Sequence, residues 1–222
     1  RDTLGVTGLN ATFAPMEWST LGSLSPVMKL TGPGALRVEA TGSMGTGFQL
    51  SAEATYVPAG FAPSRVTAEG FIGTEGAEPV FNVTGDLRPL SFTALSEDYP
   101  ELPVTGEVSG VVSLTGPFSD LSVETELETA AGPLMIQARF DAGDPARGYS
   151  LDTRAQDFLL SNLIPRLPEP TRVTGRVLAS GRGLQADSLA GEATVFLRHG
   201  EVGHLAVDTA AVILAVEGGQ LR

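Results

Sequence analysis

The 222-residue chain contains no cysteine, one tryptophan, Trp18, and one lysine, Lys29. A β-protein of this length needs no disulfides, so the missing cysteines say little about the compartment in which it works. With a single lysine, and no glycine-rich loop that ends in lysine, a Walker-type phosphate site is excluded. Trp18 has no aromatic partner close by in the sequence with which to form a stacking platform.

The residues that enzymes use are few and scattered. His199 and His204 lie five positions apart without a third ligand, and this spacing does not match the zinc-protease helix. No serine lies in a Gly-x-Ser-x-Gly elbow. Glu124, Glu126 and Glu128 alternate along one segment, which is more typical of the solvent face of a strand than of a catalytic carboxylate pair. We therefore expect no enzymatic activity, no metal site and no cofactor.

Positive charge is also scarce, because 14 basic residues against 26 acidic ones give a net charge of −12. Such a surface repels nucleic acid and anionic lipid headgroups, so we expect no nucleic-acid partner. No apolar run reaches the length of a membrane span, and no signal peptide opens the chain. The chain begins abruptly at Arg1 and its strand pattern continues almost to Arg222, so we expect an internal segment of a longer protein.

What the chain has in abundance is alternation of apolar and polar residues. From Val104 to Pro117 every even position is apolar or glycine, and all odd positions but Val111 and Pro117 are polar. This period of two predicts a β-strand with one apolar and one polar face. Related pieces recur, as Val-Thr-Gly at 6–8, 83–85, 104–106 and 173–175, and as Leu-Thr-Gly-Pro at 30–33 and 114–117.

The same alternation continues along most of the chain, in the segments 36–40, 48–56, 121–127, 134–140, 149–155, 173–179, 189–197 and 212–216. Short turns rich in glycine and proline separate these segments, which favours antiparallel neighbours in meanders. We therefore predict an all-β fold, a long curled antiparallel sheet of repetitive design that forms a groove, with one or two short amphipathic helices.

Two segments, 87–96 and 158–167, interrupt the alternation with apolar residues at near-helical spacing. We predict one short amphipathic helix in each, covering the groove through Phe92 and Leu95 in the first, and through Leu163, Ile164 and Leu167 in the second. Each is followed by proline, Val-Thr-Gly and a new strand, which indicates loose repeat units of about 1–86, 87–156 and 157–222 within one repetitive groove over 1–222.

The apolar side of the sheet has two interpretations, a sealed two-sheet core or an open trough. Its residues are mostly small or medium aliphatics, with few of the aromatics that fill sandwich cores. Glycines at 106, 110, 175 and 191 lie within the strands on the apolar side, where they permit curling or close approach. For a trough, the predicted lining is Val104, Val108, Val112, Leu114, Leu121, Val123, Leu134, Ile136, Val173, Val177, Val195 and Leu197.

The pattern of a short helical segment, proline, and then Val-Thr-Gly-x-Val-x-Gly-x-Val-x-Leu-x-Gly resembles the repeats of the AsmA-like and TamB proteins of Gram-negative bacteria. The best match runs from Leu102 to Glu124, with a looser copy from Phe158 to Leu197. This family implies a periplasmic β-groove that carries phospholipid from the inner to the outer membrane. It also implies an inner-membrane anchor and an outer-membrane β-barrel partner bound through a C-terminal region, both outside this chain.

Two functions of different kinds follow from these patterns. In the first, the trough shields phospholipid acyl chains during transport between membranes, since a uniform aliphatic lining lets a lipid slide. In the second, the repeats form a structural scaffold. That scaffold is either a chaperone-like guide for outer-membrane β-barrel proteins or a sealed-core β-solenoid adhesin.

Overall fold

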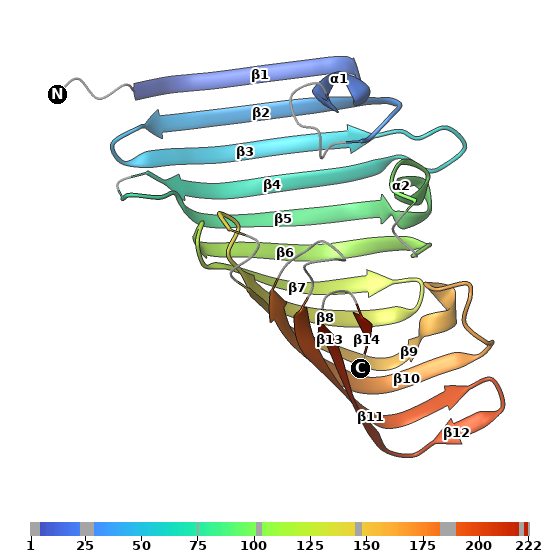
Figure 1. Ribbon diagram of the computed structural model, residues 1–222. Helices are drawn as coiled ribbons and strands as arrows, with labels where there is room; N and C mark the ends of the chain where they lie inside the picture. Colours follow the sequence, from blue (N-terminus) through green and yellow to red (C-terminus); the bar gives the residue numbers. More distant parts are fainter. Residues whose placement is uncertain are drawn as a thin grey trace. The chain divides into compact units, whose positions relative to one another are not determined.

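The computed structural model describes residues 5–22, 29–74, 76–100, 104–144, 148–182, 190–217 and 220–221. Strands account for 69 % of the chain, and all of their pairings are antiparallel (Figure 1). The predicted all-β fold of antiparallel strands with short helices is therefore confirmed. None of the helices in the described ranges is long and apolar enough to span a membrane.

The chain divides into two compact units, Arg1–Val112 and Ser113–Arg222, with the boundary inside strand β6 (Glu107–Pro117). In the first unit, five strands follow one another in sequence order as antiparallel neighbours. They are β1 (Gly5–Glu17), β2 (Pro33–Ser43), β3 (Gly47–Tyr56), β4 (Ser64–Gly73) and β5 (Val80–Ser91). The three predicted repeat units stay a prediction.

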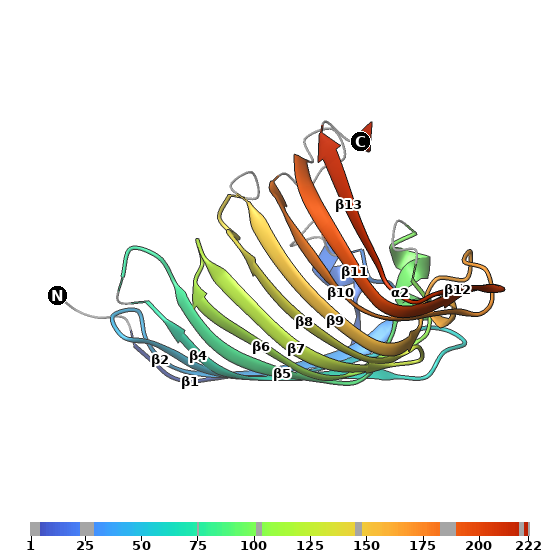
Figure 2. The same ribbon diagram turned by 90° about the horizontal axis from the view of Figure 1, so that it is seen from below.

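The second unit is also a meander in sequence order. Its strands are β7 (Leu121–Thr129), β8 (Gly132–Phe140), β9 (Tyr149–Leu159), β10 (Thr171–Arg182) and β11 (Ala190–Val202). The end of β11 pairs with β12 (Leu205–Val207), its other part pairs with β13 (Ala210–Glu217), and β13 pairs with β14 (Gln220–Leu221). Figure 2 shows that β8 to β11 bend along their length.

The turns form where the sequence provides glycine. The segment from Gly42 to Gly47 contains the hairpin turn between β2 and β3, with residues 44–46 between the two strands. At the β7–β8 turn, Gly132 has a φ of 125°, a conformation that a residue with a Cβ atom rarely adopts. Glycine at this position therefore allows two long strands to join through a two-residue connection.

The helical elements are short: α1 (Ser19–Gly22), α2 (Phe92–Asp98) and a 3₁₀ turn, η1 (Leu160–Asn162). Helix α2 begins where Ser91 ends β5, because the Ser91 hydroxyl accepts a hydrogen bond of 3.2 Å from the Ala94 amide. This is the N-cap arrangement that starts a helix. The predicted helix at 87–96 is thus present, but its first residues belong to β5.

Candidate functional site

The strand register of the second unit sorts its side chains into an apolar and a polar face. Residues that lie directly opposite each other in an antiparallel pair point to the same side of a sheet. Following these pairs from β7 to β13 gives continuous rows, one of which is Val123, Ala138, Leu151, Ala179, Ala193 and Leu214. The next row is Thr125, Ile136, Thr153, Val177, Val195 and Val212. We call the side that carries these rows the apolar face.

Eight of the predicted lining residues share this face. The register brings together Leu121, Val123, Leu134, Ile136, Val173, Val177, Val195 and Leu197. A row crosses six strands, and five spacings of ~4.8 Å make it ~24 Å long. Mostly aliphatic side chains therefore form a continuous surface across the six strands.

Most side chains of the apolar face are half-buried. Of the eight predicted residues in the second unit, Leu121 is buried, with 4 % of its surface exposed, whereas the other seven keep partial exposure. At the β13 side, Val212 is 44 % exposed. Side chains in a sealed two-sheet core are mostly buried on all sides. Within the described part of this unit, the apolar face therefore keeps contact with solvent.

The first unit repeats the design on its own strands. One row on its apolar side consists of Ala11, Val38, Ala52, Ala68 and Gly85. The next consists of Phe13, Leu36, Ala54, Val66 and Leu87. Charged residues such as Glu39, Glu53 and Glu69 lie on the other side, as the alternation predicts.

Four predicted lining residues belong to β6 or precede it, and they differ in environment. Val108 is buried, with 2 % exposure, whereas Val112 and Leu114 are half-buried. Val104 was expected within this strand, but it lies in the connection that precedes β6. The reason is Gly106, whose φ of 92° interrupts the extended chain and whose carbonyl accepts a 2.8 Å hydrogen bond from the Phe92 amide of α2.

Helix α2 covers one end of the apolar side of the first unit. Ala94, which is fully buried, packs with Trp18 and Tyr56, and Leu95 packs against this cluster. The Trp18 indole donates a 2.9 Å hydrogen bond to the carbonyl of Thr55. Trp18 and Tyr56, which are far apart in the sequence, thus lie in one buried cluster.

Asp98, the last residue of α2, connects the helix to the sheet. Its carboxylate accepts hydrogen bonds from the Thr31 amide at 3.0 Å, the Thr31 hydroxyl at 2.6 Å and the Tyr56 hydroxyl at 2.9 Å. Desolvation acts to raise the pKa of Asp98, but these hydrogen bonds outweigh it and the pKa is lowered. Burial, followed by the hydrogen bond to Asp98, raises the pKa of Tyr56 well above its usual range.

A second cover lies on the equivalent end of the second unit. Ala131, Phe158 and Leu163 form a buried cluster, against which Ile164 and Val173 pack. The prediction of an α-helix over 158–167 is wrong, because this segment contains the end of a strand and a 3₁₀ turn. Phe158 belongs to β9, and only the 3₁₀ turn η1 is helical before the prolines at 165 and 168, which a helix interior does not accommodate. Leu163, Ile164 and Leu167 therefore lie in turns after η1, where Leu167 is half-buried.

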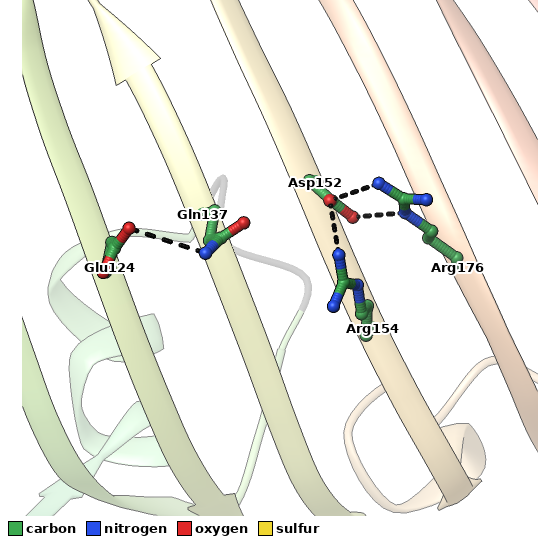
Figure 3. Close-up of polar contacts among 5 residues, drawn as sticks. All are labelled: Glu124, Gln137, Asp152, Arg154 and Arg176. Carbon is green, nitrogen blue, oxygen red and sulfur yellow. Dashed lines mark hydrogen bonds and ion pairs between the residues drawn. The ribbon is translucent and has the colours of Figure 1, made fainter.

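Several charged side chains on the polar face of the second unit form ion pairs. Arg176 on β10 binds Asp152 on β9 through two hydrogen bonds, Nε to Oδ1 at 2.7 Å and an Nη to Oδ2 at 2.6 Å (Figure 3). Arg154 binds the same carboxylate at 3.2 Å. The hydrogen bond from Arg176 is the main cause that lowers the pKa of Asp152. Glu124, whose carboxylate accepts a 3.5 Å contact from Gln137, is exposed, as expected of a solvent face.

No group of three histidine, cysteine, aspartate or glutamate side chains within the described ranges could hold a metal ion. Both histidines are exposed, His199 on β11 and His204 in the turn before β12. No protein-family model, no curated protein and no solved structure matches the chain. Within the described residues, the apolar faces of the two units are the extended feature that forms the candidate site.

Proposed function

We propose that the chain is a segment of a periplasmic bridge whose apolar sheet face shields phospholipid acyl chains during transport from the inner to the outer membrane. The observation that carries this proposal is the single-sided apolar surface of the second unit, whose side chains stay half-buried. Apolar surface that the protein itself leaves in contact with water gains free energy when another apolar group covers it.

The chemistry of the face supports a lipid chain as that group. Valine, leucine, isoleucine and alanine dominate the rows, and threonine is the main polar exception, at Thr125 and Thr153. Such a surface offers dispersion contacts without fixed polar anchors, so an acyl chain can move along it. A charged headgroup would stay outside in water, because the rows contain no charged side chain.

The buried clusters that cover the strand ends lie on the apolar side of each unit, which supports a groove on that side. The clusters around Ala94 in the first unit and Phe158 in the second each cover one end of the strands of their unit. The remaining length of each strand carries the half-buried rows. Acyl chains would therefore lie across the strands, beside the covers.

The proposal is tested by extracting the purified protein with organic solvent and analysing the extract by mass spectrometry. Phospholipid in stoichiometric amount supports acyl-chain shielding. An empty extract, together with tight binding of unfolded β-barrel strands, supports the scaffold instead and contradicts the proposal.

A further inference from the structure

The polar face of the second unit contains a row that does not follow its pattern. The register places Met135, Arg154, Arg176, Phe196 and Ala211 side by side on five successive strands. Met135 and Phe196 are 45 % and 43 % exposed, although they lie on the face that carries most of the polar side chains. Two arginines are therefore flanked by exposed apolar groups on both sides.

This row borders a hollow of about 930 Å³. Its lining includes all five side chains of the row together with Arg198 of β11. Its volume falls within the range of ~300–1,000 Å³ that is typical of small-molecule sites. The hollow lies on the opposite side of the sheet from the rows that contain Val177 and Val195.

Three arginines and no carboxylate are among the described residues that line the hollow. Arg154 and Arg176 are directly opposite across β9 and β10, an arrangement of like charges that is unfavourable without a counter-ion. Both share one carboxylate, that of Asp152, as Figure 3 shows. Within the described parts of the chain the Arg198 guanidinium forms no ion pair.

We propose that this hollow binds a long-chain fatty acid, with its carboxylate among Arg154, Arg176 and Arg198 and its alkyl chain against Phe196 and Ala211. A guanidinium matches a carboxylate with two parallel hydrogen bonds, which selects a planar anion. The flanking apolar side chains require a ligand that carries an apolar body as well as a charge. Phe196 and Ala211 follow Arg176 on the next two strands, so an alkyl chain that starts at the guanidiniums extends over both.

The test is equilibrium binding of hexadecanoate, at concentrations below micelle formation, to the whole chain carrying Val195→Asp. This background impairs the apolar face and leaves the hollow intact, since Val195 points to the opposite side from its neighbour Phe196. We expect hexadecanoate to bind in this background. Adding Arg198→Gln or Phe196→Ser should weaken binding about tenfold each.

Asp152→Asn should strengthen hexadecanoate binding, because it removes the carboxylate that competes for both guanidiniums. Hexadecanol has the same chain without the charge and should bind at least about tenfold more weakly. Arg198→Gln changes an exposed side chain that forms no ion pair with the residues that the structure describes, so it should leave the melting temperature unaltered and separates binding from folding. The proposal is overturned if Val195→Asp alone abolishes binding, if hexadecanol binds equally well, or if Arg198→Gln and Phe196→Ser have no effect.

Discussion

Val177 and Val195 lie directly opposite each other on β10 and β11, and both side chains are half-buried. The pair continues to Val212 on β13 and through Thr153 to Ile136 on β8. A cross-strand pair of valines contributes stability by covering part of each side chain, but it leaves the outer part of both exposed. The row is therefore both a stabilising element of the sheet and an unfilled apolar surface.

The first prediction uses Val195 and its neighbour Thr194, which face opposite sides of β11. Val195→Asp places a charge on the apolar face and should remove most of the phospholipid that purifies with the protein. Thr194→Asp places the same charge on the polar face and should retain it. Mass spectrometry of the extracted lipid measures both. Equal lipid content in the two variants contradicts the assignment of the lipid to the apolar face.

The second prediction separates two valines of β6. Val108 is 2 % exposed, so Val108→Asp buries a charge and should lower the free energy of unfolding by about 3–5 kcal/mol or more. Val112 is half-buried, and Val112→Asp should cost only about 1–2 kcal/mol while it impairs lipid binding. Urea unfolding followed by circular dichroism compares them. Comparable destabilisation would indicate that Val112 lies in a sealed core.

The alternating segments show most clearly which features of the sheet the sequence predicts. The period of two assigned Val123, Ile136, Val177 and Val195 to one face correctly, because pairing in a long antiparallel sheet preserves the alternation of each strand. The same alternation puts Ile213 on the opposite side from Val212, where it is 66 % exposed.

The covers and the arginine row could not be predicted in the same way. Tyr56 and Asp98 are 42 residues apart, and their hydrogen bond depends on how α2 packs, which no local pattern reports. Arg154 and Arg176 meet only through the register of β9 and β10, which contains an irregularity between Val173 and Gly175. Such contacts depend on bulges and turns that are not encoded by hydrophobic period alone.

The third prediction concerns Asp98 and pH. Its pKa is lower in the folded protein than in the unfolded chain, so its contribution to stability is complete above the unfolded pKa of about 3.9 and is lost as the pH falls through the folded pKa. Asp98→Asn should therefore flatten the decline of the unfolding free energy in acid. Tyr56→Phe removes one of the three hydrogen bonds and should flatten it only in part. Identical acid profiles for wild type and Asp98→Asn would contradict this.

The fourth prediction concerns close packing at Gly175 on the apolar side of β10. A Cβ atom there would lie 2.3 Å from the carbonyl oxygen of Phe196, closer than real Cβ contacts allow. Gly175→Ala should therefore push β10 and β11 apart and cost about 1–3 kcal/mol of unfolding free energy. Gly73→Ala in β4 is the matched control, because its Cβ would meet its nearest neighbour at 3.5 Å. Equal urea midpoints for the two variants would contradict the close approach.

The most direct test of phospholipid binding to the apolar face places a photo-reactive benzoylphenylalanine at position 195 or at position 194 of the full-length protein in living cells. After illumination, mass spectrometry identifies what each position has captured. Because Val195 belongs to the apolar face and Thr194 to the polar face, the account predicts phospholipid adducts at 195 and none at 194. Phospholipid captured equally at both positions, or at neither, would contradict it.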